Sequence, residues 1–160
     1  MRKPIPVSFF LLLYSFAFLS FTGAQPSDAA IDNAVSWAQS LVGEASFPWA
    51  DGNGRSQSTF QCSTFVANAY GRQGTTSAYI LWFVSDQHPG DLSAPRGSLL
   101  FFGRNADNRD LGHVALCAGE GRLIEAGWPL IKTGTVDEES DYLGWAWPPS
   151  DWPGRDPSGP

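Results

Sequence analysis

The spacing of apolar residues changes near residue 98, and this change constrains the fold more than any other feature. Before it, the segments 28–42 and 62–70 have apolar residues at helical spacing. After it, apolar residues form short runs that are separated by turn residues, at 98–102, 114–117, 122–125, 130–132 and 142–147. Helices first and antiparallel strands second predict an α+β domain.

The segments before residue 98 have recognisable limits. Asp28 can act as the N-cap of the first helix, and Gly43 ends its apolar pattern. Residues 44–61 are rich in glycine and serine and predict a long loop, which in a compact domain is commonly functional or mobile. The stretch 72–96 is expected to be mainly irregular, with His88 in a loop.

A β-hairpin is predicted around Ala118-Gly119-Glu120-Gly121, which connects two of the short runs. With its turn at 119–121, paired residues have numbers that sum to about 238–240. Glu125 is then expected opposite or diagonal to His113. Since strand residues alternate between the two faces of a sheet, this register would bring the carboxylate within hydrogen-bond reach of the imidazole.

The N-terminus has the layout of a secretory signal peptide. Arg2 and Lys3 precede an almost unbroken apolar run over 7–21, and small residues follow at 22–24. The run is short for a membrane span, although an uncleaved anchor is the alternative. We therefore expect residues 1–24 to be removed, 25–147 to form one domain, and 148–160 to be a flexible tail rich in proline and glycine. The protein would be secreted, with no stable membrane insertion after cleavage.

The charge of the chain excludes some partners. It has 10 basic and 16 acidic residues, and the first 24 hold two of the basic ones. So acidic a chain lacks the electrostatic footprint for nucleic acid or an anionic membrane surface. The loop 104–110 lacks the glycine and the closing glutamate of a calcium loop, and we expect no metal and no cofactor. We also expect a monomer.

Three residue types suited to nucleophilic catalysis are predicted to meet. Cys62 stands at the first turn of its helix, where free N–H groups and the helix dipole stabilise a thiolate. His113 begins a strand and can take the thiol proton, and Glu125 can accept a hydrogen bond from the other imidazole nitrogen. Nucleophile, base and orienting group then form a catalytic triad.

Three motifs carry a resemblance to the NlpC-type cell-wall cysteine peptidases. The stretch FQCSTFVANAY resembles their Asp-Cys-Ser-Gly-Phe-Val motif, and RGSLLFF resembles their Gly-Asp-Leu-Val-Phe-Phe strand. GHVALCAGEGRLIEA is similar to their Gly-His-Val-Gly-Ile-Tyr hairpin, in which the third catalytic residue follows the histidine by twelve positions, as Glu125 follows His113. The resemblance covers most of residues 30–147.

The resemblance implies a papain-like core, with the nucleophile helix packed on an antiparallel sheet. It also implies a thiol hydrolase that cleaves amide bonds in peptidoglycan stem peptides, commonly between D-glutamate and the diamino acid. Cys62, His113 and Glu125 would be catalytic. Gln61, Ser63 and Trp128 are candidate substrate-binding residues, with peptidoglycan or a muropeptide as the substrate.

The sequence departs from this family at several positions. Gln61 replaces the aspartate before the cysteine, and Ser98 replaces the aspartate of the strand motif. A neutral Gln61 loses the charge-assisted part of a contact with a stem-peptide ammonium, which leaves the cleaved bond open. Glu125 replaces the usual histidine and favours the related CHAP amidases as a second choice, which would cut the N-acetylmuramoyl-L-alanine bond.

Two further alternatives remain open from the sequence. Cys62 and Cys117 could form one disulfide in an exported protein, and the domain would then be a catalytically inactive cell-wall-binding module. An acyltransferase on the same core would differ only in its acceptor.

Overall fold

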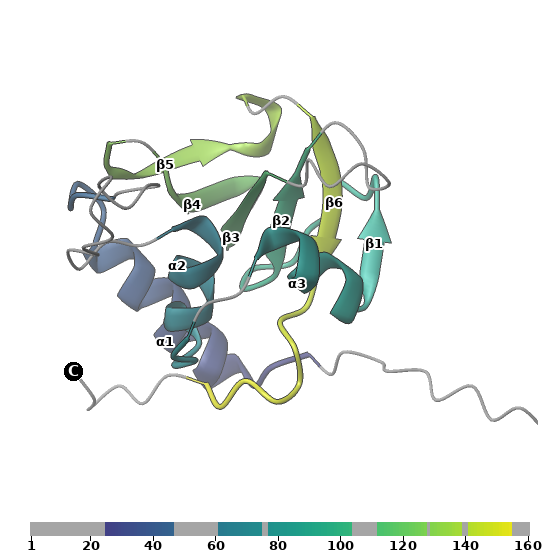
Figure 1. The fold of residues 1–160 in the computed structure, drawn as a ribbon, viewed down its shortest axis with the longest axis horizontal. Coiled ribbons are helices and arrows are strands. Elements are labelled where there is room, and N and C mark those ends of the chain that lie inside the picture. Colours follow the sequence, from purple (N-terminus) through teal and green to yellow (C-terminus); the bar gives the residue numbers. More distant parts are fainter. Residues whose placement is uncertain are drawn as a thin grey trace, which may run out of the picture.

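The architecture is an antiparallel sheet with helices on one side, as the computed structural model shows (Figure 1). The structure describes residues 25–46, 61–74, 77–103, 112–127, 129–138 and 141–154. The predicted signal peptide lies outside these residues, as do most of the 44–61 loop, the acidic loop 104–110 and the end of the tail.

Helices precede most of the strands, as the change in apolar spacing predicts. The elements in chain order are α1 (Asp28–Ser40), α2 (Cys62–Ala69), α3 (Ala78–Val84), β1 (Gln87–Pro89), β2 (Leu99–Phe102), β3 (His113–Gly119), β4 (Arg122–Ala126), β5 (Ile131–Thr135), the 3-10 helix η1 (Val136–Glu138) and β6 (Tyr142–Ala146). The strand order in the sheet is β1-β6-β2-β3-β4-β5, with every neighbouring pair antiparallel. The predicted α+β class is therefore confirmed.

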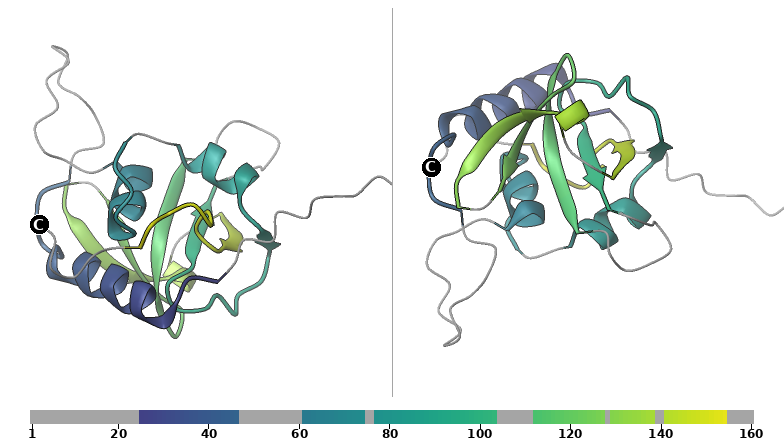
Figure 2. Two further views of the ribbon diagram at one scale, coloured as in Figure 1. Left: turned by 90° about the horizontal axis from the view of Figure 1, so that it is seen from below. Right: turned by 90° about the horizontal axis from the view of Figure 1, so that it is seen from above.

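The three α-helices lie on the same side of the sheet, as the views from below and above agree (Figure 2). Helix α2 packs mainly on β3 and β4, and α2 supplies the fully buried side chains of Phe65 and Val66 to the core. Truncation of such a side chain to alanine typically costs about 2–5 kcal/mol. The packing therefore fixes where the first residue of α2, Cys62, meets the sheet.

The expected limits of α1 differ slightly from the observed ones. Ser27, not Asp28, is the N-cap, and its hydroxyl accepts a hydrogen bond from the Ala30 N–H at 3.2 Å. Asp28 lies in the first turn, where its charge suits the helix dipole. The helix ends at Ser40, two residues before the predicted end, and Gly43 follows with φ of +93°.

The stretch 72–96 was expected to be mainly irregular, and this expectation is wrong for part of it. It contains α3 and β1. Helix α3 has an apolar sequence on its exposed face as well as its buried face, since Ile80, Phe83 and Val84 are all more than half exposed. Without a polar face, the sequence shows no helical period. His88 lies in β1, where its ring stacks on Trp145 at a centroid distance of 3.7 Å.

Gly97 joins the helices to the sheet. Its φ is +87°, and a Cβ at this position would lie within 2.9 Å of Ile31 and the Tyr70 hydroxyl. The buried Tyr70 hydroxyl donates a hydrogen bond to the Gly97 carbonyl, and the Gly97 N–H donates to Cys117 O at 2.8 Å. Only glycine combines this backbone conformation with so close an approach. Gly97 thus ties the C-terminal end of α2 to the last part of β3.

The segment after β6 runs beneath the helices (Figure 1). Pro148 is fully buried, and the ring of Trp152 packs on Tyr70 at a centroid distance of 6.0 Å. Part of the segment 148–154, which the sequence assigns to a flexible tail, therefore packs on the domain: Trp152 lies on the end of α2, and Gly154 lies beside Ala30 of α1.

Candidate active site

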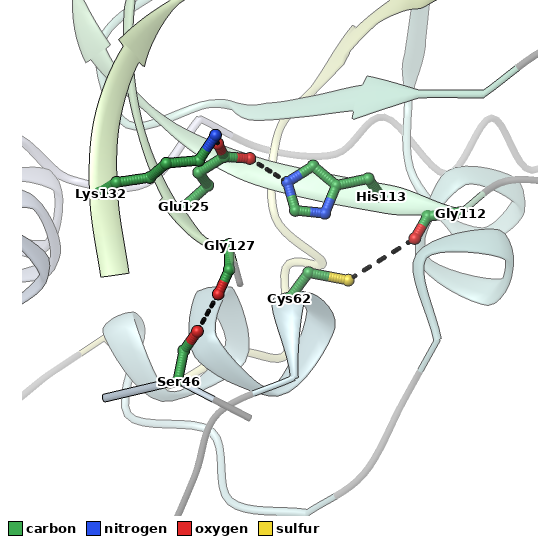
Figure 3. Close-up of polar contacts among 7 residues, drawn as sticks. All are labelled: Ser46, Cys62, Gly112, His113, Glu125, Gly127 and Lys132. Carbon is green, nitrogen blue, oxygen red and sulfur yellow. Dashed lines mark hydrogen bonds and ion pairs between the residues drawn. The ribbon is translucent and has the colours of Figure 1, made fainter. Parts of the chain in front are cut away.

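Cys62 is the first residue of α2 and lies at the edge of the domain core (Figure 3). Gln61 is the N-cap, and its side chain makes no capping hydrogen bond. The early N–H groups of the helix lie near the thiol, and that of Ser63 faces the Cys62 sulfur. The Cys62 thiol lies 3.9 Å from the Gly112 carbonyl oxygen, next to the start of β3.

His113 and Glu125 come from neighbouring strands. Leu116 pairs with Ile124 and Cys117 with Leu123. This register, continued by one pair, sets Glu125 opposite Ala115 and diagonal to His113, so the predicted hairpin register is confirmed. His113 Nε2 and Glu125 Oε2 form a hydrogen-bonded ion pair, and the other ring nitrogen points toward Cys62 (Figure 3).

The thiol and the imidazole shift each other's pKa. Burial favours the neutral thiol of Cys62, but the hydrogen bond and charge of His113, with the N–H groups of Val114 and Ser63, lower its pKa below the ordinary value. Burial also opposes protonation of His113, but Cys62 and Glu125 outweigh it and raise the pKa of His113 to about 9. This arrangement favours a thiolate–imidazolium pair at neutral pH.

Glu125 is ionised despite its burial. Its side chain is 3% exposed, which would raise its pKa, but hydrogen bonds and charges from His113 and Lys132 lower the pKa below the ordinary value. Lys132 pairs across β4 and β5 with Glu125, and its Nζ lies 2.8 Å from Oε1. Each carboxylate oxygen therefore faces one cation.

Lys132 is a site residue that the sequence reasoning missed. The predicted run 130–132 and the short connection after Glu125 gave the signal, because an antiparallel return of that run places Lys132 beside the carboxylate.

Ser46 was also missed. It is buried and donates a hydrogen bond to the Gly127 carbonyl near the site (Figure 3). No pattern in the 44–61 loop indicated that contact.

The predicted substrate-binding residues have different surroundings. Gln61 is exposed beside Cys62 and can meet a ligand. Ser63 is 3% exposed and its N–H faces the Cys62 sulfur, so its part in substrate binding stays a prediction. Trp128 lies outside the described residues.

Cys117 occupies a different environment from Cys62. Both cysteines are free. Cys117 is fully buried, and its thiol donates to Ala94 O at 3.5 Å. The Cys62 sulfur faces the N–H of Val114, three residues before Cys117. Because a strand rises about 3.3 Å per residue, about 10 Å of β3 separates Val114 from Cys117, whereas disulfide-bonded Cα atoms lie at most about 7 Å apart. The folded chain therefore does not bring the two cysteines into bonding geometry.

The described residues contain neither a metal-binding cluster nor a membrane-spanning helix. Within them, no group of three or more histidine, cysteine, aspartate or glutamate side chains could hold a metal ion. The helices seen in this part of the chain are all too short or too polar to cross a membrane.

Solved structures resemble this chain in fold. An NLP/P60-family protein similar to a lipoprotein from Staphylococcus aureus matches 79% of the chain with a TM-score of 0.61 and 18% identity. The peptidoglycan hydrolase RipB from Mycobacterium tuberculosis matches 74% with a TM-score of 0.58 and 19% identity. The chain has the NlpC/P60 fold. No protein-family model and no curated protein matches the sequence.

The NlpC/P60 fold occurs in proteins with different activities. RipD from M. tuberculosis, a non-catalytic NlpC/P60-domain protein adapted to peptidoglycan binding, matches 74% of the chain with a TM-score of 0.57 and 21% identity. The present chain spans 44% of the S. aureus protein and 63% of RipB, but 98% of RipD. The fold alone therefore does not decide between hydrolysis and binding.

Proposed function

We propose that this protein is a secreted cysteine hydrolase of the NlpC type that cleaves amide bonds in peptidoglycan stem peptides. The observation that carries the proposal is the alignment of Cys62, His113 and Glu125, in which His113 bridges a thiol and a buried carboxylate. RipB, which shares the fold, is a peptidoglycan hydrolase. The apolar run near the N-terminus supports export.

The first half of the reaction forms an acyl-enzyme. The Cys62 thiolate attacks the carbonyl carbon of the scissile amide, and the carbonyl oxygen becomes an oxyanion. The N–H groups at the start of α2 stabilise it, since the helix dipole favours negative charge there. The His113 imidazolium gives its proton to the leaving nitrogen, the C–N bond breaks, and a thioester with Cys62 remains.

The second half restores the enzyme. Neutral His113 takes a proton from water, and the resulting hydroxide attacks the thioester carbonyl. The C–S bond breaks, the acid product leaves, and the thiolate–imidazolium pair reforms. Throughout, Glu125 keeps the imidazole oriented and stabilises its protonated form.

Digestion of purified peptidoglycan by the full chain tests this proposal, with Cys62→Ser as the matched control. Mass spectrometry of the products should show new termini within the stem peptide, and the residues at those termini identify the cleaved bond. Release of L-alanine termini would instead identify the CHAP-like N-acetylmuramoyl-L-alanine amidase activity. Intact peptidoglycan after incubation with a protein that has a reactive Cys62 would contradict hydrolysis of this substrate.

A non-catalytic wall-binding module is the second candidate, and the similarity to RipD supports it. Co-sedimentation with insoluble peptidoglycan separates the two. A binder is retained by the polymer and releases no fragments, whether or not Cys62 is present. A hydrolase is retained as the Cys62→Ser variant and releases fragments as the wild type.

A further inference from the structure

Lys132 lies outside the predicted triad but contacts it directly. Its Nζ is 2.8 Å from Glu125 Oε1, while His113 contacts Oε2 (Figure 3). The Glu125 side chain is 3% exposed and the Lys132 side chain 52% exposed. The lysine therefore reaches from solvent to a buried carboxylate. A buried carboxylate needs such compensation, since loss of hydration otherwise favours its neutral form.

Four charged groups from three strands and a helix contact one another in succession, and their signs alternate. Cys62 comes from α2, His113 from β3, Glu125 from β4 and Lys132 from β5. With the thiolate and imidazolium formed, the signs are minus, plus, minus and plus. Removal of the lysine would leave two negative groups and one positive group at a partly buried site.

We infer that Lys132 is a positioning residue of this site, which holds the Glu125 carboxylate in place for His113 and completes a four-member charge chain. The inference rests on the proposed function for its catalytic meaning. Its physical content, the coupling of Lys132 to the Cys62 thiol, is independent of the substrate.

Gly127 provides the space that this contact needs. A Cβ at Gly127 would lie 2.7 Å from Lys132 Cε, so an alanine there would push the lysine stem aside. The φ of Gly127 lies outside the left-handed region, so alanine is not strained by the backbone. Gly127→Ala thus displaces the ammonium while leaving both Lys132 and Glu125 in the chain.

Loss of the Lys132 charge should shift the pKa of Cys62, His113 and Glu125 in the same direction. A nearby cation lowers the pKa of each titrating neighbour, so its removal raises the pKa of Cys62, of His113 and of Glu125. From the described elements packed on β4, the titratable or charged groups that face Glu125 are His113 and Lys132, and α2 adds Cys62 through His113. The pH profile of Cys62 reactivity should therefore move as a whole to higher pH when Lys132 is removed.

The test measures the pH dependence of Cys62 alkylation by iodoacetamide in the full chain, followed on the Cys62 peptide by mass spectrometry. Lys132→Met should raise the midpoint by about half to one pH unit, the scale of a half-exposed cation near the site. Gly127→Ala should raise it by less. Lys132→Arg keeps the positive charge, so this variant should have the wild-type midpoint within about 0.2 pH unit.

Two controls make the result specific. Arg122→Met removes one positive charge from an exposed position on β4, the strand that carries Glu125. This variant should leave the midpoint of Cys62 alkylation unchanged. In a Lys132→Met background, Gly127→Ala should add nothing, because the displaced group is already absent.

A Lys132→Met midpoint that equals the wild type would overturn the inference, as would an undiminished effect of Gly127→Ala without the lysine. If Lys132→Met fails to fold by circular dichroism, Gly127→Ala and Lys132→Arg still decide the matter. Alkylation requires no peptidoglycan, so a shifted midpoint in a protein that digests no wall would refute the proposed function and support the role of Lys132. An unshifted midpoint in an active hydrolase would do the reverse.

Discussion

At its first residue, β3 places His113 between Cys62 and Glu125; four residues later, the same strand places Cys117 against Ala94 and Gly97. At the first end the thiol faces an ionisable side chain, which lowers the pKa of Cys62. At the other end the thiol is buried largely by apolar groups and backbone, and burial raises the pKa of Cys117. The start of β3 thus contacts the activated thiol of Cys62, and the last part of the same strand carries the unreactive thiol of Cys117.

The comparison separates chemistry from architecture. The first end of β3 holds charged partners that stabilise a thiolate. The last part holds the contact with Gly97, through which Tyr70 fixes the end of α2. Substitutions at the first end should change activity with little change in stability. Substitutions at the other end should change stability and leave the pH profile in place.

The largest effect is expected for the two cysteines themselves. Cys62→Ser should lower peptidoglycan hydrolysis about a thousandfold or more, since the nucleophile is lost, with an unchanged circular dichroism spectrum. Cys117→Ala is the matched control and should retain activity within about twofold of the wild type. Comparable losses in both variants would remove the distinction between the two ends of β3.

The two histidines give the next effect. His113→Ala should cost about a hundredfold or more in turnover, the usual scale for a positioned general base. His88→Ala is the control, because two strands, β6 and β2, separate β1 from β3 in the sheet, and the three strand spacings amount to about 14 Å. Turnover would be measured by release of soluble muropeptides. Severe loss in the His88 variant, with a mild effect at His113, would place the base elsewhere.

A smaller effect with a clear sign is expected at Glu125. The carboxylate helps to raise the pKa of His113 to about 9, so Glu125→Gln should lower that pKa. The protonated imidazole is then lost at lower pH, and the alkaline limb of the activity profile should move toward acid, with reduced activity throughout. The control is Glu120→Gln, at an exposed carboxylate in the hairpin turn. A Glu125→Gln profile that overlays the wild type would reduce the triad to a Cys62–His113 dyad.

The smallest effect on activity is expected at the architectural end. Tyr70→Phe leaves the Gly97 carbonyl without the buried hydroxyl and should reduce the free energy of unfolding by about 1–3 kcal/mol. Tyr79→Phe, on the partly exposed face of α3, should change it by less than about 0.5 kcal/mol. Urea denaturation measures both. A Tyr70 variant with a shifted pH profile would show that the two ends of β3 are coupled.

Much of the site could be predicted from sequence because its contacts are local. The interval between His113 and Glu125 spans one tight hairpin, and its register is set by the turn together with a β-bulge between Cys117 and Gly119. A slip of one residue would have turned Glu125 to the other face. Cys62 begins a helix whose apolar face is clear in the sequence, so its place at the helix start could also be inferred.

Other features depend on packing that no local pattern records. Helix α3 is apolar on both faces, so its period is hidden, and its N-cap Ser77 was the only local signal. The contact between Ser46 and Gly127 joins residues 81 positions apart. The burial of Ser63 follows from how α2 lies on the sheet, which the helix sequence alone does not specify.

The most direct test of the account is the pH dependence of thiol alkylation at the two cysteines in the folded wild-type chain. Cys62 should react quickly near neutral pH, with an apparent pKa below that of an ordinary thiol. Cys117 should react only when the protein is denatured, since it is fully buried. Equal rates for both cysteines in the native protein, or modification of Cys117 alone, would contradict the assignment of Cys62 as the activated thiol.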